Sequence, residues 1–157
     1  MKHIWAPWRI EYIRAPKAKG CIFCDKPPEK KDAENYILYR GRQNFVILNL
    51  YPYNPGHLMV APYRHIASPE EMTKEERNEY FDIVNLCLKA LRDEFAPGGF
   101  NVGINMGRAA GAGIEDHVHS HIVPRWNGDT NFITTIGDVR VVPEALSDTY
   151  KKLKERF

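Results

Sequence analysis

The stretch HVHSHIVPRW, residues 117–126, sets the plan of the whole chain. It places histidines at every second position, namely His117, His119 and His121. Side chains of a β-strand point alternately to opposite faces of a sheet, so these histidines share one face. Val118 and Ile122 lie on the opposite face, where they suit packing against a core. The stretch therefore predicts a strand with a histidine row on one side and an apolar surface on the other.

The segments around this stretch predict a sheet and two helices. Apolar runs bounded by turn residues indicate strands at 36–40, 44–50 and 100–107, and 54–62 is typical of a turn that leads into a further strand. Ser68 and Thr73 each begin a capping box, and an apolar stripe with helical spacing follows and ends before Pro97. The tail ends in a helix that we expect to begin at Pro143 and to keep its lysines in solvent. Neighbouring strands on each side of the long helix can pair as hairpins, which predicts an α+β fold with an antiparallel sheet.

Length and composition narrow the class of protein. A chain of 157 residues suits one domain, 1–157, with an N-terminal arm (1–20), a core (21–126) and a C-terminal extension (127–157). A formal net charge of +2 argues against broad nucleic-acid binding. No apolar run is long enough for a membrane span, and the opening MKHIWAPWRIEYI lacks the apolar region of a signal peptide. We therefore expect a cytoplasmic protein.

The histidine row allows three interpretations. The histidines are incidental residues on an exposed face, ligands of a catalytic zinc, or a nucleophile with its helpers. The Gly-rich loop GRAAGAGIED (107–116) directly precedes them, and such a loop can bring backbone N–H groups close to a phosphate. An unprotonated imidazole beside a phosphate can attack phosphorus and form a phosphoramidate, provided that a carbonyl or carboxylate holds its other N–H. This pairing favours the third interpretation.

Two motifs resemble the histidine triad (HIT) superfamily. HVHSHIV matches the His-x-His-x-His signature, and NPGHLMVAPYRH (54–65) matches the second signature, an apolar strand opened by Pro-Gly-His. The resemblance covers roughly residues 20–126 and implies a HIT-like five-stranded antiparallel sheet with one long helix. The sequences after the triad and at the N-terminus are most similar to the diadenosine polyphosphate hydrolase and phosphorylase branch, which includes the fragile histidine triad proteins.

The resemblance implies a role for each matching residue. His119 is the nucleophile that attacks the α-phosphate and forms a nucleotidyl-histidine, and His117 orients it through its backbone carbonyl. His121 and His57 contact the phosphates or assist the leaving group. The expected substrate-binding residues are Asn49 near the ribose, Asn105, Ala112 and Gly113 at the phosphates, and Trp126 beyond the triad.

One position departs from the family pattern. The fragile histidine triad proteins carry a Gln four residues before the first triad histidine, which contacts phosphate and assists turnover. This chain has Gly113 there. Hydrolysis therefore does not follow from the resemblance, and inorganic phosphate is an alternative acceptor to water.

The motif CIFC (21–24) raises a separate question. A Cys-x-x-Cys motif can be a redox pair, an incidental pair or half of a zinc site, and the βαβ pattern expected beside a redox motif is absent. Several members of the superfamily bind a structural zinc with such a pair, the histidine after the Pro-Gly-His strand and the first triad histidine. The residues at those positions are Cys21, Cys24, His65 and His117.

The resemblance leaves several functions open. The first is cleavage of dinucleoside polyphosphates such as diadenosine tetraphosphate, with Mg²⁺ accompanying the substrate and no catalytic metal. An adenosine phosphoramidase or general nucleotide hydrolase, a non-catalytic nucleotide-binding module and a zinc-held interaction protein are the alternatives. Because HIT proteins are commonly homodimers, the resemblance also implies a homodimer.

Overall fold

The computed structural model describes residues 20–129 and 144–157. Nearly all of the predicted arm, including its tryptophans, and Pro143 lie outside these residues. The elements in chain order are α2 (Ile22–Asp25), η1 (Pro27–Glu29), α3 (Asp32–Asn35), β1 (Ile37–Arg40), β2 (Asn44–Leu48), β3 (Leu58–Pro62), η2 (Pro69–Glu71), α4 (Lys74–Phe95), β4 (Gly99–Ile104), η3 (Arg108–Ala110), β5 (Ser120–Arg125) and α6 (Leu146–Lys154).

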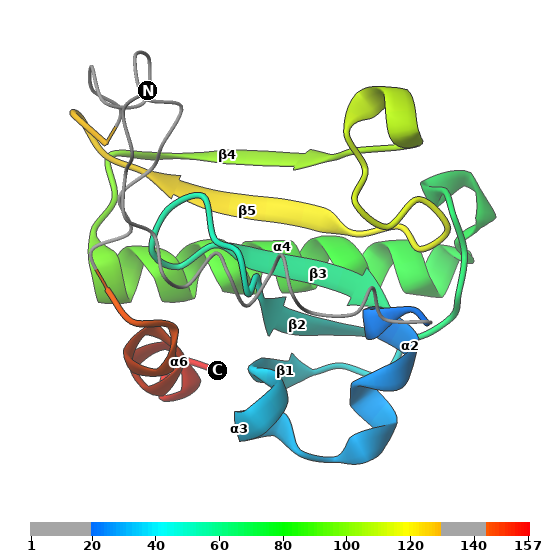
Figure 1. Cartoon of the computed structure of the whole chain (residues 1–157), viewed down its shortest axis with the longest axis horizontal. Helices are drawn as coiled ribbons and strands as arrows, with labels where there is room; N and C mark the ends of the chain where they lie inside the picture. Colours follow the sequence, from blue (N-terminus) through cyan, green and yellow to red (C-terminus); the bar gives the residue numbers. More distant parts are fainter. Residues whose placement is uncertain (1–19, 130–143) are drawn as a thin grey trace, which may run out of the picture.

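The strands form one five-stranded sheet in the order β1-β2-β3-β5-β4, and every neighbouring pair is antiparallel (Figure 1). β5 lies between β3 and β4, with His121 opposite Met59 on one side and Gly103 on the other. The predicted α+β architecture with an antiparallel five-stranded sheet, one long helix and a C-terminal helix is confirmed.

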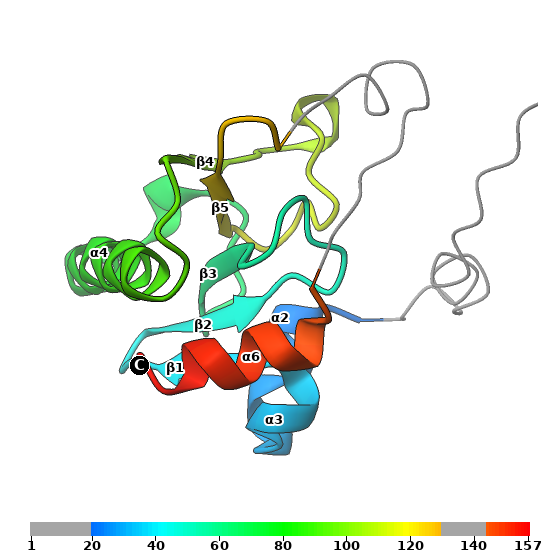
Figure 2. The same ribbon diagram turned by 90° about the vertical axis from the view of Figure 1, so that its left-hand side faces the viewer.

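The two faces of the sheet have different partners. The long helix α4 lies across one face, and α6 packs beside it near β1 (Figure 2). The main apolar core fills this side and includes Leu58, Val60, Val118 and Ile122. A smaller apolar cluster lies on the other face, which also carries the triad histidines: Phe23, Ile37, Phe45, Ile47, Met59 and Ala61. The alternation read from HVHSHIV is therefore present in the structure.

The start of the long helix follows its capping signals. Thr73 Oγ1 accepts a hydrogen bond from the Glu76 N–H at 3.2 Å, and the Glu76 carboxylate accepts one from the Thr73 N–H at 2.7 Å. This reciprocal pair satisfies backbone donors that have no partner within the helix. Arg64 also binds the buried Glu76 carboxylate, at 2.8 Å, and lowers its pKa to about 2. The Arg64–Glu76 ion pair attaches the segment before α4 to the helix. Arg64 directly precedes His65 in this segment.

All five strands are shorter than the predicted stretches, and two of the differences concern residues of the site. β5 begins at Ser120, so His117 and His119 precede it, because the Val118 N–H donates to the Ile66 carbonyl at 2.7 Å instead of entering the strand ladder. β2 ends at Leu48, which leaves Asn49 at the start of the loop that leads to His57. As a result, His119 and Asn49 lie in loops, where the backbone hydrogen bonds of the sheet do not constrain them.

Helix α6 covers the β1 edge of the sheet. The Tyr150 hydroxyl donates to the Ile37 carbonyl at 3.3 Å, and Lys154 Nζ donates to the Leu38 carbonyl at 2.8 Å. Lys154 is exposed, as predicted for the lysines of this helix, and its ammonium also satisfies a carbonyl that an edge strand leaves unpaired. The helix begins at Leu146, three residues after the expected Pro143. Across the described part of the chain, no helix is both long and apolar enough to span a bilayer.

Candidate active site

His119 is a buried residue that lies directly before β5, on the face of the sheet that carries the other triad histidines. It is 4% exposed, and its Nδ1 lies 2.9 Å from the backbone carbonyl of His117. A carbonyl only accepts, so Nδ1 carries the proton and Nε2 of the neutral ring holds a lone pair. Burial lowers the pKa of His119, although the His117 carbonyl acts in the opposite direction. The ring is therefore neutral near pH 7, with Nε2 available as a nucleophile.

His121 and His57 form a hydrogen-bonded pair beside His119. The rings of His119 and His121 are 4.9 Å apart, and His57 Nε2 lies 2.9 Å from His121 Nδ1. His57 is fully buried in the turn that precedes β3. Burial, with a smaller contribution from the charge of His119, lowers the pKa of His121 to about 4. The ring of His121 thus stands next to the nucleophile without positive charge at neutral pH.

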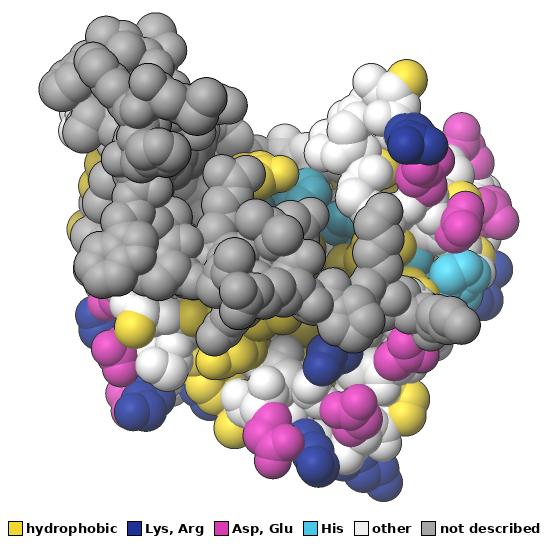
Figure 3. Space-filling model, in the orientation of Figure 1, with side chains coloured by type: hydrophobic (Ala, Val, Ile, Leu, Met, Phe, Trp, Pro, Cys, Tyr) yellow, Lys and Arg dark blue, Asp and Glu magenta, His cyan; other side chains and the backbone are white. Residues whose placement is uncertain are grey.

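Aromatic rings pack against this group. The ring of Phe23 lies 4.7 Å from that of His119, and the ring of Tyr53 lies 4.6 Å from that of His57. Phe23 comes from the Cys-x-x-Cys segment, which packs against the smaller apolar cluster. Histidine side chains are visible on this face of the molecule, between hydrophobic ones (Figure 3). The site therefore joins polar nitrogens to an apolar surround that suits a nucleobase as well as a phosphate.

A second cluster lies at the start of the triad. Its ligand-type atoms, one from each residue, all lie within 4.8 Å of one another: Cys21, Cys24, His65 and His117. Burial and the Cys21 thiol raise the pKa of the Cys24 thiol to about 11. A bound cation would displace such protons, because the thiolate is the form that binds metal.

The distances in this cluster fit a tetrahedral zinc ion. Zinc–ligand bonds of about 2.3 Å to sulfur and 2.0–2.1 Å to nitrogen separate sulfur from nitrogen by about 3.5 Å and two nitrogens by about 3.3 Å. The sulfur–nitrogen distances are 3.3 Å for Cys21 and 3.4 Å for Cys24 to His117 Nδ1, and the two Nδ1 atoms of His65 and His117 are 3.2 Å apart. The donor set is therefore arranged as a structural zinc site requires.

His117 belongs to both clusters. Its Nε2 donates to the Pro62 carbonyl at 2.9 Å, so its Nδ1 is an unprotonated nitrogen directed at the cysteines. Its backbone carbonyl accepts from His119 Nδ1. A carbonyl that holds the non-ligating N–H is the usual way to orient a metal-binding histidine. The Cys₂His₂ cluster and the nucleophile are thus joined through His117.

The predicted substrate-binding residues fall into two groups. Asn49 is at the site: its Oδ1 accepts from the Tyr51 N–H at 2.9 Å, and its Nδ2 lies 3.4 Å from His57 Nδ1. The other group has no side-chain hydrogen bond to the histidines among the residues that the structure describes: Asn105, Ala112, Gly113 and Trp126. Of these, Gly113 is exposed, and a Cβ atom added there would meet no atom within 4 Å.

Sequence reasoning missed a network that holds the histidine-bearing loop. The Asp129 carboxylate accepts from Arg125 Nε at 2.7 Å, from Asn54 Nδ2 at 2.8 Å and from the Trp126 N–H at 3.1 Å. Asn54 also donates to the Pro124 carbonyl. The network ties the turn before His57 to the end of β5. The only signal in the sequence was the turn-type composition around Asn54 and Asp129, which does not reveal their pairing.

The fold and the two histidine motifs define a class of nucleotide-binding proteins, and the comparison with known families agrees. The chain belongs to the HIT domain family, because the model of that family matches residues 30–128. The fold recurs in a histidine triad nucleotide-binding protein from Sulfolobus tokodaii, with a TM-score of 0.70, 29% identity and coverage of 87% of this chain and 91% of that one.

Two further relatives carry names that state a substrate or a bound metal. The AP-4-A phosphorylase of Mycobacterium tuberculosis (strain H37Rv) is 39% identical over 161 residues, which cover 98% of this chain and 83% of that protein. A Zn-bound histidine triad family protein from Mycobacterium smegmatis superposes with a TM-score of 0.70 at 27% identity, covering 87% of this chain and 92% of that one.

Proposed function

We propose that this chain cleaves dinucleoside polyphosphates, of which diadenosine tetraphosphate is the model substrate, through a nucleotidyl group carried on His119. The observation that carries the proposal is the bond from His119 Nδ1–H to the His117 carbonyl at 2.9 Å, which leaves Nε2 with a lone pair inside a buried site. Membership of the HIT family and the similarity to a protein named AP-4-A phosphorylase support it.

The first step is attack on the α-phosphorus. The Nε2 lone pair of His119 forms a nitrogen–phosphorus bond, and the bond from phosphorus to the bridging oxygen breaks. The leaving nucleotide departs as a polyphosphate anion. The ring gains positive charge as it bonds to phosphorus, and the His117 carbonyl on Nδ1–H stabilises that charge. His121 lies beside the nucleophile and is placed to bind the phosphate oxygens.

The second step returns the nucleotidyl group to an acceptor. An oxygen of inorganic phosphate or of water attacks phosphorus, the nitrogen–phosphorus bond breaks and His119 regains its lone pair. Phosphate yields ADP directly, whereas water loses a proton and yields AMP. We favour phosphate, because Gly113, four residues before the triad in the chain, leaves open space where the resemblance places a Gln in the hydrolytic branch.

One incubation tests both the activity and the acceptor. The zinc-loaded protein is mixed with diadenosine tetraphosphate, with and without inorganic phosphate, and the nucleotides are separated. ATP plus ADP, formed only with phosphate, supports phosphorolysis, and ATP plus AMP in water alone identifies a hydrolase. Cleavage of adenosine phosphoramidate with no cleavage of diadenosine tetraphosphate would replace the proposal by the phosphoramidase activity. Nucleotide binding without any product would indicate the binding module.

Zinc is the second part of the proposal. We propose that Cys21, Cys24, His65 and His117 hold one structural zinc ion, which supplies no chemistry to the reaction. Its contribution would be to anchor the N-terminal Cys-x-x-Cys segment to the sheet and to fix the ring of His117. The Zn-bound relative from Mycobacterium smegmatis supports the choice of metal. Mg²⁺ enters only as a companion of the polyphosphate substrate.

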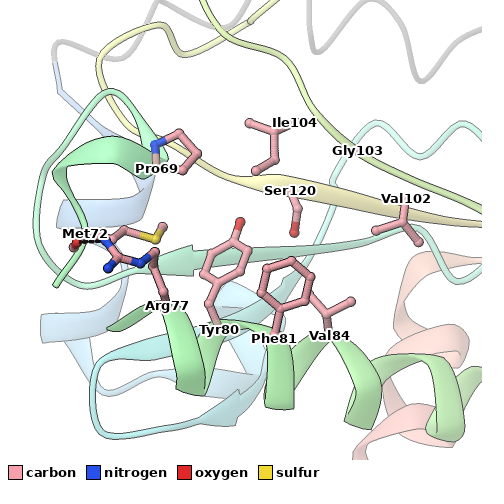
Figure 4. A pocket seen from close by; sticks show the side chains of 10 residues that line it. All are labelled: Pro69, Met72, Arg77, Tyr80, Phe81, Val84, Val102, Gly103, Ile104 and Ser120. Atoms are coloured by element: carbon pink, nitrogen blue, oxygen red, sulfur yellow. Dashed lines mark hydrogen bonds between the residues drawn. The ribbon is translucent and has the colours of Figure 1, made fainter. Parts of the chain in front are cut away.

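The third part of the proposal is a homodimer. β4 is an edge strand, and Val102 on it and Phe81 on α4 are 48% and 70% exposed. Between these elements lies an apolar pocket of about 390 Å³, on the face opposite the histidines (Figure 4). A second copy that pairs with the β4 edge would cover both side chains, and exposed apolar edges otherwise invite aggregation. The roles of Asn105 and Ala112 at the phosphates, the contact of Trp126 with substrate and the cytoplasmic location stay predictions.

A further inference from the structure

Two hydrogen-bond donors converge on one nitrogen of His57. The peptide N–H of Tyr53 donates to His57 Nδ1 at 3.1 Å, and the Asn49 side-chain nitrogen lies 3.4 Å from the same atom. The orientation of the Asn49 amide is not free, because its oxygen already accepts from the Tyr51 N–H at 2.9 Å. Both groups therefore present hydrogens to Nδ1, and neither can accept one from it.

This convergence sets the tautomer of His57. A ring nitrogen that accepts a hydrogen bond holds no proton, so the proton of the His57 ring is on Nε2. His57 is fully buried, and the hydrogen on Nε2 points to His121 Nδ1 at 2.9 Å. The same rule then applies to His121: its Nδ1 accepts, so its own proton is on Nε2. The backbone N–H of Tyr53 thus determines which nitrogen carries the proton in both imidazole rings.

We infer that the peptide N–H of Tyr53, assisted by the Asn49 amide, is a positioning group that makes His121 a hydrogen-bond donor at Nε2 while both rings stay uncharged. The inference rests on the proposed function and deepens it, because it states how His121 meets the phosphate. Tyr53 acts through His57 and His121 and not by touching the reacting atoms.

The direction of the chain matters for a phosphate substrate. With the proton on Nε2, His121 offers a hydrogen to a phosphate oxygen. In the reversed chain, each ring would carry its proton on Nδ1, and His121 would offer a lone pair to an oxygen that also carries one. No proton has to be transferred, because a polyphosphate leaves as an anion. Loss of one donor to a buried acceptor should therefore shift the tautomer ratio and slow the first step about tenfold.

Tautomers can be observed directly by NMR. In zinc-loaded protein with ¹⁵N-labelled histidine and no nucleotide, long-range ¹H–¹⁵N correlations identify the protonated nitrogen of each ring. We expect Nε2–H for both His57 and His121 in the wild type. Nδ1–H on either ring would overturn the inference. The measurement needs no turnover, so a chain that shows this pattern and yet cleaves no dinucleoside polyphosphate would refute the proposed function separately.

Three variants separate the N–H from the side chain. Replacement of Tyr53 by its α-hydroxy analogue exchanges the peptide for an ester, which removes the N–H and keeps the ring. Tyr53→Ala, the matched control, removes the ring and keeps the N–H. Asn49→Leu removes the second donor without a change of backbone, and serves if the ester variant does not fold. We expect Nδ1–H signals to appear in the ester and Asn49→Leu proteins, with kcat lowered about tenfold in the ester, and the wild-type pattern in Tyr53→Ala. Unchanged tautomers in the ester protein, or an altered pattern in Tyr53→Ala, would overturn the inference.

Discussion

His119 Nδ1 and the backbone carbonyl of His117 are 2.9 Å apart, and this bond joins the proposed nucleophile to the residue that also completes the Cys₂His₂ cluster. His117 is fully buried and is fixed on its other side by the Pro62 carbonyl. A shift of His117 therefore moves the atom that orients His119. The Cys₂His₂ cluster and the proposed reaction site are therefore connected through His117, and variants of each side can separate their contributions.

His119→Asn removes the nucleophile and keeps a side-chain N–H at the δ position, from which His119 Nδ1 donates to the His117 carbonyl. We expect the rate of diadenosine tetraphosphate cleavage to fall by at least about 10³-fold, because no other residue replaces a covalent catalyst. The measurement is product formation, together with trapping of nucleotidyl-protein in acid-sensitive, base-stable form. Thermal unfolding of the variant serves as the control for folding. A variant that keeps more than a tenth of the wild-type rate would rule out the covalent mechanism.

Cys24→Ser weakens the cluster that we assign to zinc. The zinc content should fall from about one ion per chain to almost none, and the melting temperature should fall by about 5 °C or more, because metal binding stabilises only the folded chain. Elemental analysis and calorimetry on the same sample give both values. The control is Cys87→Ala, since Cys87 is buried in the α4 core and belongs to no such cluster among the residues that the structure describes. Equal zinc content in the Cys24→Ser protein and the wild type would exclude the site.

The pH dependence of stability should carry the signature of His121. Its pKa is about 4 in the folded chain and about 6.5 when unfolded, so above pH 6.5 both states are neutral and His121 contributes nothing to the pH dependence. As the pH falls from 6.5 to 4, the unfolded chain binds a proton that the folded chain does not. Stability should then fall by no more than about 1 kcal/mol per pH unit, because the half-buried ring is partly screened by water.

Urea unfolding at pH 5 and pH 7 measures this effect. His121→Asn removes the titrating group, so the difference in stability between the two pH values should shrink in that variant. A difference that stays the same in wild type and variant would mean that His121 titrates normally in the folded chain.

Gly113→Gln tests the acceptor. The backbone at Gly113 is not left-handed and an added Cβ meets no atom within 4 Å, so the substitution should be tolerated structurally. A Gln amide in that space would compete with inorganic phosphate, and we expect the ratio of ADP to AMP to fall about tenfold. Gly113→Ala adds only a methyl group and should keep the wild-type ratio. If both variants keep it, Gly113 does not determine the acceptor.

Phe81→Glu tests the homodimer. Phe81 is 70% exposed on α4, and a carboxylate there would have to be buried without a partner when two copies associate. The protein should change from dimer to monomer in light scattering at micromolar concentration. Phe81→Leu keeps an apolar side chain and should stay dimeric. A wild-type protein that is monomeric at all concentrations tested would refute this part of the proposal.

Much of the fold could be predicted from the sequence. The strand periodicity and the capping boxes at Ser68 and Thr73 depend on neighbours within a few positions, so the five strands, the long helix and the C-terminal helix were all predicted. The ends were less accurate. β5 starts at Ser120 because Val118 bonds to Ile66, a partner far away in the sequence. The division of the chain into arm, core and extension stays a prediction.

The catalytic and metal-binding residues were selected by motif, and the resemblance supplied their roles, which stay predictions. No local pattern could indicate that the Asn54–Asp129–Arg125 network or the Tyr53 N–H supports them. Such groups are common in turns, and their partners are chosen only when the loops pack.

The sequence by itself determined which side chains share a face. The period of a strand places His119 and His121 together and Val118 opposite them, and this follows from backbone geometry alone. Only the tertiary structure decided which atoms meet. Cys21 lies next to His117 Nδ1, 96 positions away, and His57 Nε2 meets His121 Nδ1, 64 positions away. The reason is that these contacts depend on how the loops close over the sheet, and hydrogen bonds between distant residues form only after the core has brought them within about 3 Å.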